Sequence, residues 1–378
     1  MPDVLIYADT LRSPELRHEV PLPVPDPFLY VEREGRRYAF SSSLETVRLG
    51  ELEGIDARPY EEVGLDDLIA RGVDREEQYL HLALSACRAL GVTSARVPHT
   101  FPLELADHLR AGGIELIPDR RFFSARRRVK TEAELRGILR AQRAAEAAMD
   151  AVRGLLRRAE QDGSALSLEG QPLTCERLRR AVGEVLTERD AVADEIIVSH
   201  GPQTAIGHEM GFGVIAPGEP IVVDVFPRDR ESGCYADMTR TFVVGQAPEE
   251  LVVYHRLVQE ALALALSQIR AGASARELYL AVCDLFEQAG YRTGRSKRPG
   301  EVLAEGFYHG LGHGVGLEVH EEPGMGLAST ATLVAGDVVA VEPGLYRPGF
   351  GGCRLEDLVL VREDGCQRLT KYAYDLAP

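Results

Sequence analysis

The feature that most constrains this chain is a repeated pattern in which an acidic residue ends an apolar, strand-like run. Pro217–Asp224 and Val334–Glu342 each contain a Gly followed by an acid, then Ile, Val or Ala residues, then a carboxylate six positions after the Gly. A second acid follows thirteen residues later in one copy, at Asp237, and fourteen residues later in the other, at Glu356. The second part of the chain therefore reads as an internal duplication.

A carboxylate within a buried strand must be paired, protonated or bound to a cation, because an isolated charge away from water is costly. Four such acids in two matching hairpins can converge about a pseudo-two-fold axis. They would repel one another unless cations lay among them. The repeat therefore predicts a metal site, and four separate structural acids at strand ends are the alternative.

Three of the ten histidines fall within twelve residues, at His309, His313 and His320, in a segment with Gly at every second position from 310 to 316. So many glycines disfavour a helix, so we expect a loop or strand edge that presents imidazoles. Neutral imidazole binds Zn, Mn, Co or Fe, and histidine transfers protons near neutral pH. A structural Gly-rich loop with incidental histidines is the alternative.

The length of 378 residues suggests two domains. We expect a smaller mixed α/β domain over residues 1–125 and an α+β catalytic domain over 126–378. Thr131 and Glu134 form a capping-box pattern at the start of a long helix. Further helices are expected at 78–90, 103–109, 249–269 and 275–289, and the basic stretch 120–130 is interpreted as a linker or a domain interface.

Composition narrows the classes of partner. The formal net charge of -16 argues against nucleic acid and against an anionic membrane surface. No apolar run approaches the roughly 18 residues of a membrane span. The six cysteines are scattered and the first residues look like a strand rather than a leader, so we expect a cytoplasmic protein with reduced thiols.

At the level of motifs, about residues 129–378 resemble the pita-bread metallopeptidases, in the branch that contains prolidase (Xaa-Pro dipeptidase), aminopeptidase P and creatinase. The matching pieces occur in the order and with the spacing of that family. They are Val223-Asp224, Ala236–Thr241, His309–Pro323, Val341–Tyr346 and Gly352–Asp357.

The resemblance implies a pita-bread catalytic domain with a pseudo-two-fold repeat, preceded by the smaller N-terminal domain. It also implies two divalent metal ions (Mn, Co or Zn) and a hydroxide that bridges them. Its implied ligands are Asp224, Asp237, His313, Glu342 and Glu356.

The same resemblance assigns residues to the substrate and to proton transfer. Glu342, His309 and His320 are the catalytic candidates, with Glu342 accepting a proton from the attacking water. His208, His309, His320 and Arg354 are the substrate-binding candidates. Tyr346 and Thr239 are weaker candidates, and Thr239 could simply close a strand hydrogen bond.

The chain departs from its relatives beside the first acid. Relatives usually have a Gly soon after this aspartate and a gap of eleven to the next, whereas here Phe226-Pro227 follow and the gap is thirteen. We expect a longer hairpin turn within 228–233. A shift of two residues preserves side-chain facing on a strand.

The expected activity is hydrolysis of Xaa-Pro dipeptides or short peptides by a homodimer. Aminopeptidase P, which acts on longer Xaa-Pro peptides, is the first alternative. Creatinase is disfavoured, because relatives with that activity need no metals and this chain keeps all five ligands. A non-catalytic pita-bread binding module is the alternative from another class, and it usually lacks metal ligands.

Overall fold

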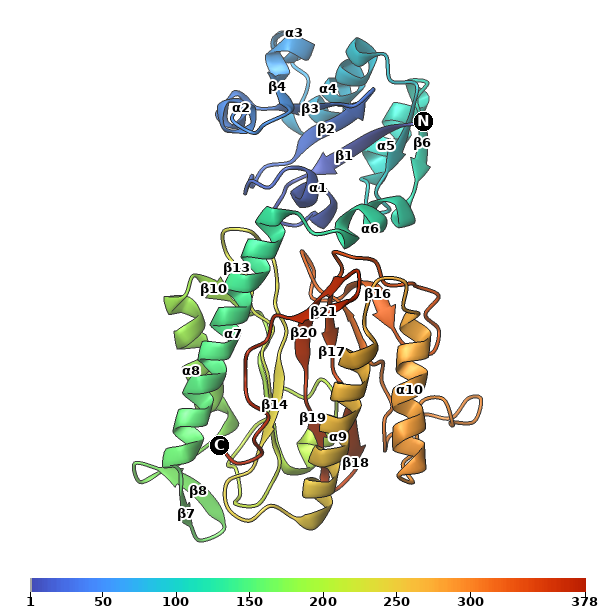
Figure 1. Ribbon diagram of the computed structural model, residues 1–378. Helices are drawn as coiled ribbons and strands as arrows, with labels where there is room; N and C mark the ends of the chain where they lie inside the picture. Colours follow the sequence, from blue (N-terminus) through green and yellow to red (C-terminus); the bar gives the residue numbers. More distant parts are fainter. Residues whose placement is uncertain (1) are drawn as a thin grey trace. The chain divides into compact units, whose positions relative to one another are not determined.

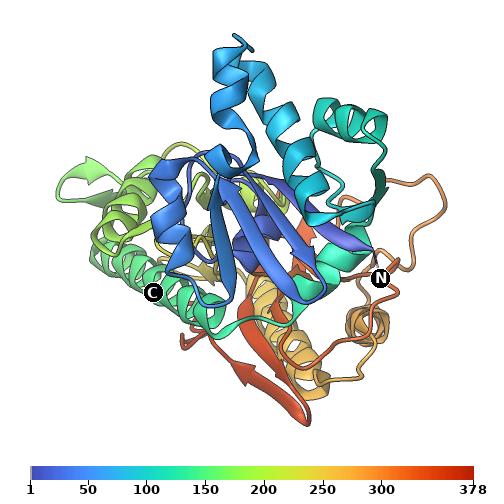
Figure 2. The same ribbon diagram turned by 90° about the horizontal axis from the view of Figure 1, so that it is seen from above.

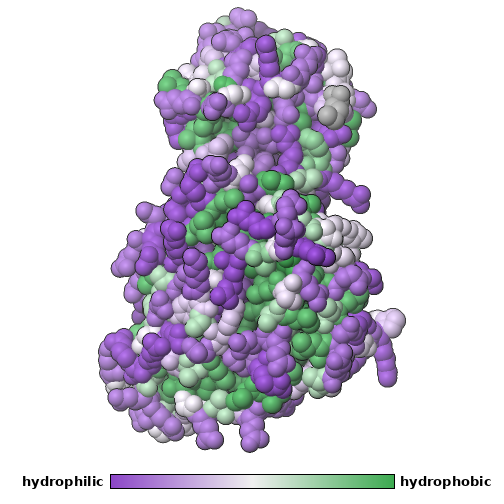
Figure 3. Space-filling view, viewed as in Figure 1, coloured by the Kyte–Doolittle hydropathy of each residue, from purple (hydrophilic) through white to green (hydrophobic). Residues whose placement is uncertain are grey.

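The computed structural model describes residues 2–378 and divides into two compact units, the first ending at Arg127 and the second beginning at Arg128. Figure 1 shows their elements. None of the helices in the described residues is long and apolar enough to cross a membrane. Hydrophilic residues cover most of the face in Figure 3, as expected for a chain with 59 acidic and 43 basic residues.

The first unit is a six-stranded mixed sheet between two layers of helices. The strand order is β4-β3-β2-β1-β5-β6, and Figure 2 shows helices on either side of this sheet. Its strands are β1 (Asp3–Ala8), β2 (Phe28–Arg33), β3 (Arg36–Ser41), β4 (Ile55–Pro59), β5 (Ser94–Val97) and β6 (Glu115–Pro118). Its helices are α1 (Pro14–Glu19), α2 (Ser43–Gly50), η1 (Tyr60–Val63), α3 (Leu65–Ala70), α4 (Arg75–Leu90), α5 (Leu103–Ala111) and α6 (Arg120–Arg128).

Alternation along the strands explains the two layers. Leu29 and Val31 of β2 pack with α4 and α5, whereas Phe28 and Tyr30 pack with α1, α2 and α6. Successive side chains of a strand point to opposite faces, so one strand serves both cores.

The basic stretch 120–130 is largely helical, although no helix was expected there. Asp119 accepts a hydrogen bond from the Phe122 N–H at 3.0 Å, and Phe123 is buried. An acid at the helix start and one buried aromatic ring stabilise a short helix despite its five arginines.

The second unit repeats one arrangement twice: a three-strand antiparallel core backed by two helices. In the first half, α7 (Glu132–Arg158) and α8 (Cys175–Glu188) pack on β11 (Ile197–His200), β12 (Ile221–Asp224) and β14 (Thr239–Phe242). In the second half, α9 (Glu249–Gln268) and α10 (Ala275–Gln288) pack on β17 (Val338–Val341) and β20 (Asp357–Arg362), and β15 (Gly312–Gly314) pairs with β17 in the same sheet. The strand orders β11-β12-β14 and β15-β17-β20 correspond.

Shorter elements complete this unit. The second-half sheet is extended by β16 (Glu321–Met325) and β21 (Gly365–Arg368), and β18 (Gly344–Arg347) pairs with β19 (Gly351–Arg354). The others are β7 (Glu160–Asp162), β8 (Ala165–Leu168), β9 (Gln171–Pro172), β10 (Ala191–Val192), η2 (Gly201–Ala205) and β13 (Arg228–Asp229). The capping box of Thr131 and Glu134 is present at the start of α7, so that prediction is confirmed.

Candidate active site

A cavity of about 610 Å³ lies in the second unit, and all nine residues assigned to metal, substrate or proton transfer line it. They are Asp224, Asp237, His313, Glu342, Glu356, His208, His309, His320 and Arg354. Other lining residues include Glu195, Ile197, Phe226, Tyr308 and Val319, so residues up to 161 positions apart in the chain are brought to one place.

Strand alternation directs the first pair of acids into the cavity. Ile221, Val223 and Val225 pack toward α7 and α8, so Asp224 faces the other way. Asp224 pairs with Thr239 in the β12–β14 ladder. The Val225 N–H donates to the Met238 carbonyl at 3.0 Å, which continues the register and places Asp237 opposite Phe226. Asp224 and Asp237 therefore share one face, offset diagonally.

The second pair of acids lies in a longer hairpin with one continuous register. Val341 pairs with Asp357 between β17 and β20, and Gly344 pairs with Arg354 between β18 and β19. Glu342 is therefore directly opposite Glu356. Asp224 and Asp237, thirteen residues apart, are thus diagonal neighbours across their two strands, whereas Glu342 and Glu356, fourteen residues apart, are directly opposite each other.

Thr239 and Thr241 join the two hairpins. The Glu356 N–H donates to the Thr239 carbonyl at 3.1 Å, and the Thr239 hydroxyl donates to Glu356 Oε2 at 2.7 Å. Thr241 Oγ1 donates to the Arg354 carbonyl at 2.9 Å and accepts from the Arg354 N–H at 3.1 Å. A strand of each repeat thus holds the other in register.

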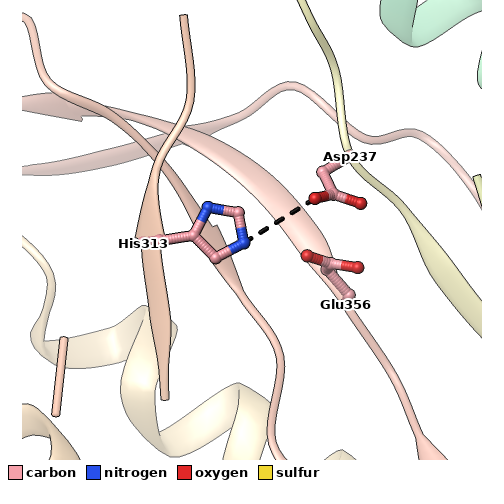
Figure 4. A group of neighbouring side chains, drawn as sticks. All are labelled: Asp237, His313 and Glu356. Carbon is pink, nitrogen blue, oxygen red and sulfur yellow. Dashed lines mark ion pairs between the residues drawn. The ribbon is translucent and has the colours of Figure 1, made fainter. Parts of the chain in front are cut away.

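His313, on β15, presents one ring nitrogen to the acids (Figure 4). Its Nδ1 lies 3.1 Å from the Gly314 carbonyl oxygen, which can only accept, so Nδ1 carries the proton and Nε2 has the free lone pair. Nε2 lies 3.7 Å from Asp237 Oδ2 and 3.7 Å from Glu342 Oε1. Burial lowers the pKa of His313, which keeps the ring neutral.

The carboxylates meet the requirements of a cation site. Asp237, His313 and Glu356 each offer a ligand atom, all within 4.8 Å of one another. Among residues 2–378, Asp224 Oδ1, Asp237 Oδ1 and Glu356 Oε1 are buried without a hydrogen-bond partner. Burial, then the neighbouring acids Glu356, Asp224 and Glu342, raise the pKa of Asp237. Such a donor set of carboxylates and one imidazole fits divalent Mn, Co or Zn.

Arg354 is buried beside this cluster. Its Nη2 donates to Asp224 Oδ2 at 2.7 Å, its Nη1 to the Tyr346 hydroxyl at 3.2 Å and its Nε to Thr239 Oγ1 at 3.3 Å. A guanidinium has five N–H donors, so two remain for a further acceptor.

The remaining histidines line the cavity from loops. His309 Nδ1 lies 2.7 Å from the Gly310 carbonyl oxygen, so its Nε2 accepts from the Tyr346 hydroxyl at 2.9 Å. The ring of His320 lies edge-on to that of His313, with centroids 4.3 Å apart. Burial lowers the pKa of both His309 and His320. His208 follows η2 and lines the cavity.

The hairpin after Asp224 is long, as expected. The Asp229 N–H donates to the Cys234 carbonyl at 2.8 Å, so the turn lies at the tip of an extended β12–β14 hairpin, away from the acids. Sequence reasoning missed Glu195 and Ile197 as lining residues. Glu195 and Ile197 are two residues apart, which indicates that they share one face of an extended segment. That this face adjoins Asp224 follows only from the pairing of Ile197 with Asp224 in the fold.

Comparison with known proteins identifies the family. Residues 136–363 match the model of metallopeptidase family M24, well over half of the chain. The chain therefore belongs to metallopeptidase family M24.

Two curated relatives are similar over their matched parts. The Xaa-Pro dipeptidase of Pyrococcus furiosus is 34% identical over 185 residues, which is 49% of each chain. The probable dipeptidase PepE of Mycobacterium tuberculosis is 34% identical over 183 residues, 48% of this chain and 45% of the relative. The match thus spans about half the length of these curated relatives.

A solved structure extends the likeness to the whole fold. The X-Pro aminopeptidase of Thermotoga maritima superposes with a TM-score of 0.79, covering 99% of this chain and 97% of that chain, at 21% identity. The pita-bread fold expected from the sequence is confirmed, together with the mixed α/β N-terminal part.

Proposed function

We propose that the chain is a dinuclear metallopeptidase that hydrolyses the Xaa-Pro bond of dipeptides. The observation that supports this most is the convergence of four carboxylates and the His313 Nε2 lone pair on one cavity, beside an arginine with two N–H donors to spare. The membership in family M24 agrees with a peptidase, and the Pyrococcus furiosus relative bears the name Xaa-Pro dipeptidase.

Asp224, Asp237, His313, Glu342 and Glu356 would hold two divalent ions. When bound, these ions lower the pKa of a water molecule and polarise the peptide carbonyl. The unpartnered buried oxygens of Asp224, Asp237 and Glu356 support this assignment, because cations would offset the cost of burying them. Manganese, cobalt and zinc all suit the donor set.

Glu342 is the proposed proton acceptor for the attacking water. It is directly opposite Glu356 in the hairpin and lines the cavity. His320 is proposed to donate a hydrogen bond to the oxygen of the scissile carbonyl as negative charge develops there.

His309 and Tyr346 are proposed as the proton relay. A proline nitrogen is a poor leaving group until it gains a proton, so the reaction needs a donor on that side. The hydrogen bond between His309 Nε2 and the Tyr346 hydroxyl offers a path for this proton. Burial raises the pKa of Tyr346, which keeps the phenol protonated at neutral pH.

Arg354 and His208 are proposed to bind the carboxylate of the dipeptide. Two N–H groups of Arg354 are available after its three protein contacts, and His208 lines the same cavity. Only in an Xaa-Pro dipeptide does the proline residue itself have a free carboxylate. This contact would therefore set the preferred length of the substrate.

The resemblance and the acidic composition further suggest a cytoplasmic homodimer that acts on peptides, with no nucleic-acid or membrane partner. Light scattering of the purified protein tests the dimer: a mass near twice 41.4 kDa supports it, and the mass of one chain excludes it.

Steady-state hydrolysis of Ala-Pro and Ala-Pro-Ala tests the proposed activity, with protein loaded separately with Mn²⁺, Co²⁺ and Zn²⁺. We expect kcat/KM to be higher for Ala-Pro. A preference for the tripeptide by more than a few-fold would favour aminopeptidase P, the second candidate, which the name of the Thermotoga maritima structure supports. Binding of peptide without turnover of either, and without bound or activating metal, would favour a binding module.

A further inference from the structure

Glu195 belongs to the same face of the first-half sheet as the acids. Ile197 pairs with Asp224 across β11 and β12, so their side chains share a face. Glu195 precedes Ile197 by two residues, and both line the cavity, as expected from the two-residue period of extended chain. The neighbouring β10–β13 ladder is shifted by one residue relative to β11–β12, so the chain bulges near Glu195.

Phe226 is opposite Asp237 on that face and, like Glu195, lines the cavity. Hydrogen bonds join Val225 to Met238 and Ala236 to Pro227, so Phe226 and Asp237 form a non-hydrogen-bonded pair, in which side chains are closest. Adjacent strands are about 4.8 Å apart, so Glu195 is two strand spacings, roughly 10 Å, from Asp237 at the backbone. The exposed acid Glu195, the aromatic ring of Phe226 and the proposed metal ligand Asp237 thus all line this cavity.

Glu195 is the acid of the cavity that has no other assignment. Four of its five lining carboxylates are proposed metal ligands. The side chain of Glu195 makes no hydrogen bond or ion pair in the part of the chain that the structure describes, and it is exposed to solvent. A carboxylate in this position offers an acceptor to a cationic group of a bound ligand.

We propose that Glu195 binds the α-ammonium group of the substrate and that Phe226 packs against the side chain of its first residue. This inference rests on the proposed function and adds the part of the site that recognises the N-terminus. The α-ammonium nitrogen of a peptide and the carbonyl of its first peptide bond belong to the same residue. Binding of the ammonium group by Glu195, in the cavity that holds the proposed metal ligands, thus brings only the first peptide bond to those ligands.

Two consequences distinguish this role from general support of the fold. Ligands without the amino group do not use Glu195, so its replacement leaves their affinity unchanged. Ligands with the amino group lose a charge-assisted hydrogen bond, which is stronger than a neutral one.

The test compares Ala-Pro with propionyl-proline, which has the same shape and lacks the amine. KM for Ala-Pro and Ki for propionyl-proline as a competitive inhibitor are measured on metal-loaded wild type and on Glu195→Gln, with metal content determined for each. We expect KM for Ala-Pro to rise about tenfold in Glu195→Gln, with Ki and metal content unchanged.

Asp194→Asn is the matched control, because Asp194 is an exposed acid one residue away that is not among the cavity-lining residues. It should leave both KM and Ki at their wild-type values. An unchanged KM in Glu195→Gln, or equal rises of KM and Ki, overturns the role of Glu195 while the proposed activity stands. Failure of the wild type to hydrolyse either Ala-Pro or Ala-Pro-Ala overturns the proposed function and this inference with it.

Discussion

The Nη2 of Arg354 lies 2.7 Å from Oδ2 of Asp224, so a buried guanidinium of the second repeat is hydrogen-bonded to the first acid of the first repeat. Side chains of both residues are almost inaccessible to solvent. The pair therefore joins the two halves of the pita-bread domain at the cavity, and it fixes one oxygen of Asp224 while the other has no hydrogen-bond partner in residues 2–378.

Replacing Arg354 by Met should destabilise the metal-free protein by about 3–5 kcal/mol, because it leaves Asp224 buried without its partner. The free energy of unfolding in urea measures this. Arg354→Lys should lose less, since a cation remains, although it cannot reproduce the three-way contact with Asp224, Tyr346 and Thr239. A loss below about 1 kcal/mol for Arg354→Met would contradict the structural role.

Thr239→Val should weaken Mn²⁺ binding by about 10- to 100-fold, because the hydroxyl that orients Glu356 Oε2 is lost. Titration calorimetry of metal-free protein measures the affinity. Thr241→Val is the control: its hydroxyl bonds the Arg354 backbone rather than a carboxylate. Equal losses in the two variants would argue against a specific role for Thr239.

Lys130 and Glu321 form a buried ion pair between the start of α7 and β16, next to His320. Lys130→Met should lower the free energy of unfolding by about 3–5 kcal/mol, because it leaves the buried carboxylate of Glu321 without this ion-pair partner. The double variant Lys130→Met/Glu321→Gln should lose clearly less than the sum of the two single losses. Additive losses in urea unfolding would show that the two side chains are not coupled.

His255 should make the stability of the domain sensitive to mild acid. Burial lowers its pKa, and its Nε2 donates to the Tyr374 carbonyl at 2.6 Å. The unfolded chain then binds the proton more readily, so this stability is complete above the ordinary histidine pKa of about 6.5 and is lost as pH falls below it.

His255→Gln keeps a donor for the Tyr374 carbonyl and removes the titrating ring. Wild type should therefore lose more unfolding free energy than this variant between pH 7.5 and 5.5. Urea unfolding at the two pH values measures both losses. Equal losses would mean that His255 does not contribute to the acid response.

Much of the fold was predictable because local patterns determined it. The capping box of Thr131 and Glu134 and the helical periodicity of 249–269 are short-range signals, and the structure has helices at both places. The repeat of Asp224 and Glu342 likewise follows from Gly, acid and apolar residues that are close in sequence. The helix that begins at Arg120 was not predicted. The N-cap at Asp119 and the buried ring of Phe123 stabilise it more than the repulsion among its arginines destabilises it.

The fine geometry of the site was not predictable from sequence, because it depends on pairing between distant strands. The sequence spacings of Asp224 to Asp237 and Glu342 to Glu356 differ by one, yet the registers make the first pair diagonal and the second direct. Likewise, the three acceptors of Arg354 come from three different strands. Only the folded chain brings Glu195 into this cavity.

The metal content of Glu356→Ala tests most directly whether five residues form a two-metal shell: Asp224, Asp237, His313, Glu342 and Glu356. Purified protein is saturated with Mn²⁺, desalted and measured by elemental mass spectrometry beside wild type and Glu363→Ala, an exposed acid in the turn after β20. We expect about two ions per chain in wild type and in the control, and fewer than about one in Glu356→Ala. Equal metal content in all three proteins would contradict it.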